Sequence, residues 1–393
     1  DVLRAISLSF SYKGGSANIY RYAVNKKYSP LLYSSLALLY KNKKRYVDSI
    51  DTYSEFIDKN KSSRHAYKFH QNIIALYKEA GISDAIVPEK VKFINNFGPG
   101  TSYQKNINKD EWNNLNKSIE KNVIDLASYY HANTKGKNKV KNATESEKWY
   151  RYYLTYYSSG SQAQQLNFKL AELLNDTKQY VKAINEYEKS AYQYPVKDSK
   201  SAYAAISLYE KPKQSDHRWR NRLKNAHVKF YNEFGTHKHA NTVLLKASQY
   251  QFDDKEYTDA FSTSLILINK QRIDGKIYSS AILIYAHSSF ELEKYPEAET
   301  GYKKAYAVAE PKLKNSLRDK AAASAYLSAK TLFNINPKLA IQELARVGNE
   351  YKGTEVAGTA SFDAASLLMK QNNTSQAESI LLGLKNTKAK GFD

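Results

Sequence analysis

The segment KWYRYYLTYY, residues 148–157, restricts the possible folds more than any other part of this chain. Successive residues of an α-helix turn by about 100°, so an arc of about 200° holds its six aromatic side chains and Leu154. The other side keeps only Lys148, Arg151 and Thr155. A helix that lies on one core needs an apolar stripe only somewhat wider than about 100°. We therefore predict a helix that is covered on two sides, as in a stack of helices.

The residues after this helix predict a tight corner and a second helix. Gly160 suits a helix end, and Ser161 with Gln164 three residues later forms a predicted capping box. Leucines then recur at helical spacing, at Leu166, Leu170, Leu173 and Leu174. A stacked unit of this kind cannot bury its apolar faces alone, so it predicts repetition along the chain.

The length and composition fit a repeat array or a chain of two or three domains. The 393 residues exceed the usual span of one compact core. A hydrophobic content of 42% with 25% charged residues is ordinary for a folded protein. No apolar run approaches the roughly 20 residues that cross a bilayer. The chain opens at Asp1 without Met or a signal-like segment, so we expect a processed or truncated piece.

The charge and the cysteine count bound the chemistry. Cysteine is absent, which excludes disulfides, thiol nucleophiles and thiolate metal sites. The net charge of +21 favours acidic protein partners, anionic surfaces or nucleic acid. Abundant Lys, Asn and Tyr are also typical of proteins from AT-rich genomes, and this alternative explanation of the charge stays open.

The stretch that begins at Gln164, QQLNFKLAELLNDTKQYVKAINEYEKSAYQYP, resembles the tetratricopeptide repeat. The residues that carry the likeness are Leu170, Ala171, Tyr180, Ala183, Tyr187, Ser190 and Pro195. That repeat is a helix hairpin of about 34 residues, and small residues at its eighth and twentieth positions let the paired helices approach closely. Bulky side chains there would force the backbones apart.

The separation of twelve residues between two small residues recurs along the chain. The six pairs are Ala37/Ser49, Ala171/Ala183, Ser248/Ala260, Ala286/Ala298, Ser328/Ala340 and Ala365/Ala377. The residue expected to open the second helix is aromatic in four of them, at Tyr46, Tyr180, Tyr257 and Tyr295. In the last two pairs Pro337 and Thr374 depart from this pattern.

Further hairpins are indicated by how their second helices end, with an aromatic residue, a glycine-containing corner and a small or polar restart. These ends are FINNFGPGTSY from Phe93, YLTYYSSGSQA from Tyr153, FYNEFGTHKHA from Phe230 and NEYKGTEVAGTA from Asn349. We predict an all-α, right-handed superhelical solenoid of about ten tetratricopeptide-like hairpins, spaced by about 39 residues. Its two continuous parts are degenerate hairpins at 1–158, with a basic loop at 131–144, and a tetratricopeptide array at 159–393.

This manner of ending is similar to that of extracytoplasmic tetratricopeptide families of Gram-negative bacteria. Examples are the lipoprotein of the outer-membrane barrel assembly machine and the periplasmic coordinator of the Tol-Pal system. The resemblance implies a scaffold in the periplasm or at the outer membrane of a bacterium.

The resemblance also implies where partners bind, because the first helices of stacked hairpins line a concave groove. The family's groove positions map onto Leu31, Ser34, Leu38, Lys41, Asn42, Gln165, Phe168, Glu172, Asn175, Asp176, Thr242, Leu245, Gln249, Phe252, Asp253, Ser280, Leu283, His287, Phe290 and Glu291. This set is mixed in polarity and lacks the concentrated cationic clamp that captures a terminal carboxylate in chaperone-binding members. It favours a folded partner or an extended segment held by shape and apolar contact.

Two basic segments each have two interpretations. The predicted loop from His131 to Thr144 is rich in lysine and has no acidic residue, so it is either a docking arm for an anionic partner or a solvated insertion. In the segment from Lys211 to Lys229, three arginines surround Trp219, which is compatible with phosphate binding and base stacking. Trp219, Leu223, Ala226 and Phe230 also form a helical stripe, which favours core packing with exposed arginines.

No catalytic, cofactor or metal site is predicted. The sequence contains no nucleophile elbow, P-loop, zincin helix or dinucleotide fingerprint. The paired acids Glu186/Glu188 and Asp253/Asp254 are expected on solvated helix faces or in turns. Most of the 34 tyrosines are predicted to fill gaps between hairpins, with Tyr129 and Tyr130 as the exceptions.

The function predicted from the sequence is therefore that of a non-enzymatic scaffold that mediates protein–protein interaction. Its expected partners are other proteins, acidic ones among them. Peripheral membrane association through a partner or a missing flank stays open, and so does self-association. The first alternative is a nucleic-acid-binding helical repeat protein, which is less favoured. The second is a structural subunit that assembles by end-to-end stacking.

Overall fold

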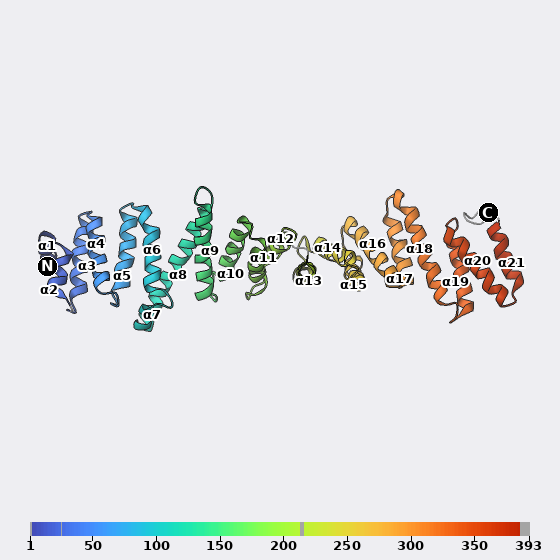
Figure 1. Cartoon of the computed structure of the whole chain (residues 1–393), viewed down its shortest axis with the longest axis horizontal. Coiled ribbons are helices and arrows are strands. Elements are labelled where there is room, and N and C mark those ends of the chain that lie inside the picture. The colour runs from blue at the N-terminus through green and yellow to red at the C-terminus, as the bar shows by residue number, and fades with distance from the viewer. Residues whose placement is uncertain (1, 25, 213–215, 386–393) are drawn as a thin grey trace. The chain divides into compact units, whose positions relative to one another are not determined.

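The computed structural model describes residues 2–24, 26–212 and 216–385. Over these ranges the chain forms 21 α-helices and no strand (Figure 1). It divides into two compact units, an N-terminal unit of Asp1–Ser201 and a C-terminal unit of Ala202–Asp393. Within each unit the helices pack in chain order, which confirms the predicted all-α solenoid of helix hairpins. The right-handed course of the solenoid stays a prediction. No helix in the described ranges combines the length and the apolar character that a membrane span needs.

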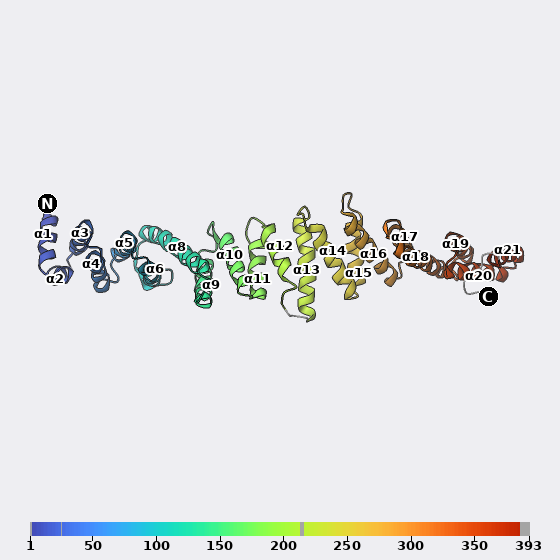
Figure 2. The same ribbon diagram turned by 90° about the horizontal axis from the view of Figure 1, so that it is seen from above.

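The N-terminal unit contains helices α1 and α2, four hairpins, the short helix α7 and the first residues of α12. Helices α1 and α2 precede α3/α4, α5/α6, α8/α9 and α10/α11, and the unit boundary falls within α12 (Figures 1 and 2). The bounds are α1 Val2–Tyr12, α2 Ser16–Ala23, α3 Ser29–Asn42, α4 Tyr46–Lys59, α5 Ala66–Glu79, α6 Ser83–Phe97, α7 Ser102–Asn106, α8 Lys109–Ala132, α9 Lys139–Tyr156, α10 Ala163–Asp176, α11 Tyr180–Tyr192 and α12 Ser199–Leu208.

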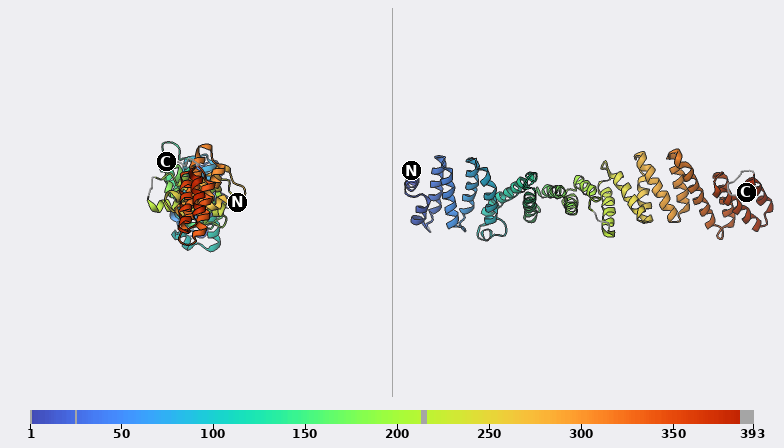
Figure 3. Two further views of the ribbon diagram at one scale, coloured as in Figure 1. Left: turned by 90° about the vertical axis from the view of Figure 1, so that its right-hand side faces the viewer. Right: turned by 45° about the horizontal axis from the view of Figure 1, so that its top comes forward.

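The C-terminal unit continues with the same alternation of first and second helices, visible from α14 onward in Figure 3. Its strongest contacts join consecutive helices, such as α14 with α15, α16 with α17 and α19 with α20. The bounds are α13 His217–Phe234, α14 Ala240–Asp253, α15 Tyr257–Ile268, α16 Gly275–Glu291, α17 Tyr295–Val308, α18 Pro311–Thr331, α19 Pro337–Glu350, α20 Glu355–Lys370 and α21 Thr374–Lys385.

Close helix approach at the paired small residues is present in five of the six predicted pairs. In these five, every member is at most 1% exposed. The Ser49 hydroxyl donates a hydrogen bond to the Ala37 carbonyl at 2.8 Å, which a larger side chain would prevent. Gly301 lies so close to α16 that a Cβ there would sit 2.8 Å from the Ala286 Cβ. The small side chains are therefore required by contact between two backbones.

The sixth pair, Ser328/Ala340, was placed in the wrong register. Ala340 is buried, but Ser328 is only half-buried, while Ala325 and Ala329 are buried beside it. The reason is the turn that joins α18 to α19, which occupies residues 332–336 and is longer than the turns of the other five pairs. A longer turn shifts the residue of the first helix that meets the second helix.

Those five hairpins share one turn conformation. The residue two positions before each second helix has a positive φ, and these residues are Lys44, Lys178, Lys255, Glu293 and Asn372. The next residue donates its backbone N–H to a carbonyl five positions back, as from Gln179 to Leu174 at 2.8 Å. This is the Schellman arrangement, which satisfies carbonyls at the helix end. Four of the five residues are Lys or Glu, for which the left-handed region is unfavourable.

Replacing Lys255 by glycine is expected to stabilise the C-terminal unit by about 0.5–1 kcal/mol, because glycine has no Cβ to oppose φ of 61°. Urea denaturation followed by circular dichroism measures the change. Lys304, an exposed residue within α17, provides the control, since its replacement by glycine should instead destabilise by about the same amount. Destabilisation by both substitutions would show that the turn is not strained.

The aromatic segment is covered on two sides, as predicted. Trp149, Tyr150 and Tyr153 are at most 1% exposed, and α9 packs against both α8 and α10. The capping box at Ser161 and Gln164 is wrong, because α10 begins after Gln162, which makes no side-chain cap. The Gln164 amide instead donates to the carbonyls of Ser190 and Val196, at 2.9 and 2.7 Å.

The basic loop is shorter than the predicted 131–144. Helix α8 continues to Ala132 and α9 begins at Lys139, so that only residues 133–138 lie between the helices. Residues 131–132 therefore belong to the end of α8, and residues 139–144 to the start of α9.

Candidate functional site

Four of the ten groove residues predicted in the C-terminal unit meet around one cavity. This cavity has a volume of about 530 Å³, and its walls come from α14, α16, α17 and α18. Four of the predicted residues line it, namely Phe252, His287, Phe290 and Glu291. The remaining lining residues are Tyr302, Lys320 and Ala323. We refer to these seven residues as the groove cluster.

The position of the groove cluster follows from the repeat. His287 comes directly after Ala286, the small residue buried against α17, and its ring contacts both Tyr302 of α17 and Phe252 of α14. Its Nδ1 lies 2.8 Å from the Tyr302 hydroxyl, and the two rings are 5.3 Å apart. The Phe252 ring of α14 lies 6.0 Å from His287.

The electrostatics of the groove cluster leave two charged groups at neutral pH. Burial, followed by the positive charge of Lys320, lowers the pKa of His287 to about 4, so its imidazole is neutral. Burial also raises the pKa of Tyr302, whose hydroxyl stays protonated. The Lys320 ammonium lies 5.9 Å from the centre of the Tyr302 ring. The cavity therefore offers aromatic walls, one cation and the Glu291 carboxylate, which suits an amphipathic side chain of a partner.

The other predicted groove residues of this unit extend the same surface. Thr242, Gln249, Asp253 and Ser280 are exposed, while Leu245 and Leu283 are half-buried. The Gln249 amide donates a hydrogen bond to the Asp253 carboxylate at 2.8 Å. None of these six side chains is buried, and their assignment to a binding groove stays a prediction.

The N-terminal unit holds the other two predicted sets, on α3 and α10. On α3, Leu31 and Leu38 are 58% and 52% exposed, which leaves two leucines without cover, and Lys41 pairs with Glu79 of α5 at 2.9 Å. Ser34 is half-buried and Asn42 is exposed. On α10, the Lys200 ammonium lies 4.5 Å above the Phe168 ring. The remaining members of that set are Gln165, Glu172, Asn175 and Asp176, all at least partly exposed.

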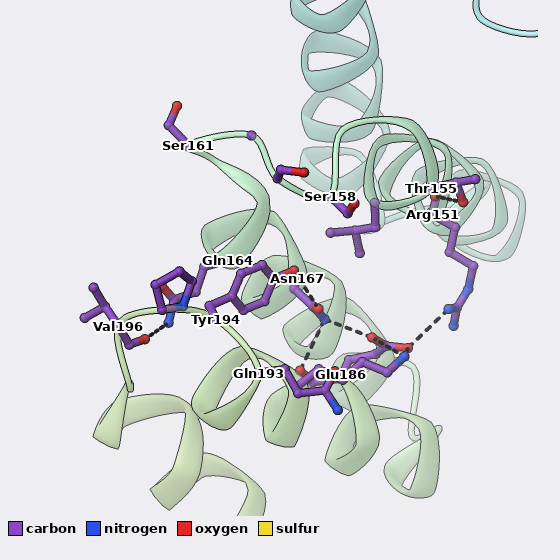
Figure 4. A pocket seen from close by; sticks show the side chains of 15 residues that line it. Arg151, Thr155, Ser158, Ser161, Gln164, Asn167, Glu186, Gln193, Tyr194 and Val196 are labelled. Carbon is purple, nitrogen blue, oxygen red and sulfur yellow. Dashed lines mark hydrogen bonds and ion pairs between the residues drawn. The ribbon is translucent and has the colours of Figure 1, made fainter.

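A second candidate site, which we call the polar cleft, lies in the N-terminal unit and is shown in Figure 4. It has a volume of about 850 Å³ and is formed by the end of α9, the start of α10, α11 and the loops at 158–161 and 193–196. Glu186 occupies its floor and is only 5% exposed. Arg151 and Lys189 contact one carboxylate oxygen of Glu186 at 3.2 and 3.1 Å, and the Asn167 amide donates to the other at 2.9 Å.

The charge of Glu186 is stabilised within the polar cleft. Burial alone would raise the pKa of Glu186, but hydrogen bonds from Asn167 and Lys189 and the charge of Arg151 bring it below its ordinary value. The Tyr194 hydroxyl in turn donates to the Asn167 carbonyl oxygen at 3.2 Å. These groups satisfy one another, and the Arg151–Glu186 pair joins two neighbouring hairpins. We therefore interpret the polar cleft as a structural junction between the α8/α9 and α10/α11 hairpins.

The prediction that Glu186 lies on a solvated helix face is wrong. Its partner Asn167 could have indicated this burial. Asn167 lies four residues before the small residue Ala171, and the corresponding residues of three other repeats are the buried Tyr33, Leu244 and Ile282. A polar side chain at a buried position needs a hydrogen-bond partner from a neighbouring helix. Asp254, by contrast, lies in a turn as predicted and pairs with Lys224 and Arg220, at 2.7 and 3.1 Å.

In the basic segment from Lys211 to Lys229, Arg220, Arg222 and Lys224 make their contacts within the unit. Trp219, Leu223 and Phe230 are buried, which confirms the predicted stripe, and Ala226 is half-buried. The Arg220 guanidinium lies 4.4 Å from the Tyr250 ring and also pairs with Asp254. Residues 213–215 of this segment lie outside the described ranges. The arrangement favours a structural role for these arginines over nucleic-acid contact.

Metal ligands do not gather in the described ranges, which contain no group of three or more His, Cys, Asp or Glu side chains placed to hold an ion. Tyr129 is 49% exposed, as expected for a residue beside a loop, whereas Tyr130 is half-buried and makes an edge contact with it.

Comparison with known proteins gives similarity at the level of structure. No family model and no curated protein matches the chain. A crystal structure of a tetratricopeptide repeat protein from Parabacteroides merdae is 12% identical, with 69% of this chain and 94% of that chain covered and a TM-score of 0.28. The tetratricopeptide repeat domain of P58(IPK) is 14% identical, with 87% of this chain and 99% of that chain covered and a TM-score of 0.25. What the chain itself shows is an array of helix hairpins, five of which share buried pairs of small residues and one turn conformation.

Proposed function

We propose that this chain is a non-enzymatic scaffold that binds other proteins along the groove of its first helices. The observation that carries the proposal is the convergence of Phe252, His287, Phe290 and Glu291, from two successive first helices, around one cavity. Aromatic rings with a few placed polar groups are typical of surfaces that hold a partner's side chains. The proposed site of action is the periplasm or the outer membrane of a bacterium, and its support is the resemblance of the hairpin ends to extracytoplasmic repeat families.

The kind of partner follows from the charges of the groove cluster. Lys320 and Glu291 have opposite charge and flank an aromatic wall, so neither a purely acidic nor a purely basic segment suits the whole cavity. A folded surface or an extended segment that inserts an apolar side chain fits this arrangement. The mechanism is static, because a rigid groove collects partners and long-range charge accelerates encounter.

Photo-crosslinking in the source cell tests the proposal. A crosslinking amino acid at Gln249, exposed beside the groove cluster, should capture defined envelope proteins, whereas the same amino acid at Lys304 on second helix α17 should not. Lys320→Glu should reduce capture from Gln249 at least about fivefold, because it reverses the charge that faces the cavity. The matched variant Lys304→Glu should leave capture unchanged.

Two outcomes contradict the proposal. Equal capture from Gln249 and Lys304, insensitive to Lys320→Glu, would remove the groove as the binding surface. Recovery only of ribosomal proteins or RNA would overturn the envelope location and favour the nucleic-acid alternative. Circular dichroism of each purified variant shows whether the solenoid is intact.

A further inference from the structure

The α8/α9 hairpin has the same helix contact as the α3/α4 hairpin but a longer tip. In the α3/α4 hairpin, the Ser49 hydroxyl donates to the Ala37 carbonyl, 12 residues earlier. In α8/α9, the Ser146 hydroxyl donates to the Ala127 carbonyl at 2.9 Å, 19 residues earlier. Both contacts are buried. The two contacts are equivalent, and α8/α9 contains seven more residues between its contact points.

All seven extra residues lie at the tip. The first helix ends five residues after the contact alanine in both hairpins, at Asn42 and at Ala132. The second helix starts three residues before Ser49, at Tyr46, but seven residues before Ser146, at Lys139. The insertion thus lengthens the loop and adds about one turn to the start of α9. Figure 1 shows this loop at the free end of the hairpin.

The insertion carries exposed cations. Its lysines are Lys135, Lys137, Lys139 and Lys141, all exposed. None of these four makes an ion pair within the described structure, and no acidic residue occurs between Leu126 and Thr144. Val140, between two of the lysines, is 72% exposed. A hairpin of ordinary length would have the same buried contact without these residues.

The backbone of the tip is held by its own hydrogen bonds. The Asn142 amide donates to the Asn133 carbonyl at 2.6 Å, and the Thr134 hydroxyl donates to the His131 carbonyl at 2.8 Å. Gly136 adopts a φ of 110°, which a residue with a Cβ rarely does. The Asn142 and Thr134 side chains thus bond within the tip, whereas the four lysine ammonium groups face solvent and are accessible to an external partner.

We propose that this tip is a docking site for an anionic lipid membrane surface. Lysines near such a surface each strengthen binding by about fivefold, and an exposed valine among them can enter the interfacial region. A projecting tip can reach a flat, charged bilayer without any concave counterpart. The proposal is independent of the groove, which uses other hairpins.

The chemistry of the tip disfavours other anionic partners. Proteins that bind single-stranded nucleic acid use aromatic stacking together with arginine, and residues 133–142 contain neither. An acidic peptide needs a groove or a strand edge that orders its backbone, which a convex loop does not supply. The bilayer is thus the occupant whose chemistry the tip matches best.

Vesicle flotation of the full chain tests this proposal. The chain should float with phosphatidylcholine vesicles that contain about a quarter phosphatidylglycerol, and not with phosphatidylcholine alone. Replacing the four tip lysines by glutamine should lower the partition coefficient at least about tenfold, and Val140→Ser should lower it by a smaller factor. Added salt should weaken binding, because it screens charge.

A charge-matched variant separates the tip from the net charge of the chain. Lys26, Lys61, Lys105 and Lys109 are exposed and lie in or beside the turns at the opposite ends of the hairpins. Their replacement by glutamine removes the same charge and should leave flotation nearly unchanged. Equal loss in both variants, absence of flotation of the unaltered chain, or tip-dependent binding of single-stranded RNA with no binding of vesicles would each overturn the proposal.

Discussion

Replacing Ala298 by leucine is expected to lower the free energy of unfolding of the C-terminal unit by about 3 kcal/mol. Ala298 is fully buried, and its partner Ala286 also touches Gly301, so that the added atoms meet the α16 backbone and find no cavity. The two helices must separate or the leucine must adopt a strained rotamer. Urea denaturation followed by circular dichroism measures the loss, and hydrogen exchange should show faster opening of α16 and α17 than of the N-terminal unit.

Ser328→Leu is the matched control for this substitution. Ser328 occupies the same predicted position in its repeat but is half-buried, so that a larger side chain has room to turn towards solvent. Its replacement should change stability by no more than about 0.5 kcal/mol. Similar losses in both variants, or an unchanged melting temperature for Ala298→Leu, would contradict close helix contact as the basis of the repeat.

The repeated hairpins could be predicted because their constraint is local. Two helices joined by a three-residue turn must meet at a fixed distance from that turn, so a small residue twelve positions from another marks the contact. This reasoning located Ala171 with Ala183 and Ala286 with Ala298. It failed at Ser328 because the turn before α19 is longer, and turn length is set by details that the spacing does not contain.

The α8/α9 hairpin shows the same limit in another way. Its contact residues Ala127 and Ser146 are both small and buried, but a spacing of 19 hides them from a search for pairs twelve apart. Only the hydroxyl-to-carbonyl bond reveals that the contact is equivalent to the one in α3/α4. A basic loop could therefore be predicted at this place, but its predicted bounds were too wide.

The buried polar groups could not be predicted from spacing alone. Glu186 and Glu299 both stand in second helices, where carboxylates are normally solvated, and both are instead buried by a neighbouring hairpin. Their partners Arg151 and Arg346 are 35 and 47 residues away along the chain. Such pairings depend on how one hairpin stacks on the next, which is a property of the array and not of one repeat.

Acid is expected to destabilise the C-terminal unit through Glu299. Burial alone would raise the pKa of Glu299, but hydrogen bonds from Arg346, Lys303 and Tyr351 lower it from 4.5 to about 2. The unfolded chain therefore binds this proton at higher pH than the folded chain does. The stabilisation is fully present above about pH 4.5 and is lost as the pH falls towards 2, with an upper limit of about 3 kcal/mol.

Arg346→Met should remove most of this stabilisation at neutral pH as well. It leaves the Glu299 carboxylate, which is 10% exposed, without the guanidinium that contacts both of its oxygens at 2.8 and 3.0 Å. Breaking such a pair costs about 3 kcal/mol, and replacing Glu299 by methionine in addition should restore part of the loss, since no unpaired charge then remains buried. Urea denaturation between pH 7 and pH 3 measures both effects.

Lys312→Met, which breaks an exposed pair with Glu310, should change neither the stability nor its dependence on pH. If Arg346→Met behaved like Lys312→Met, the Arg346 guanidinium would add nothing to the stabilisation that Lys303 and Tyr351 already give the Glu299 carboxylate.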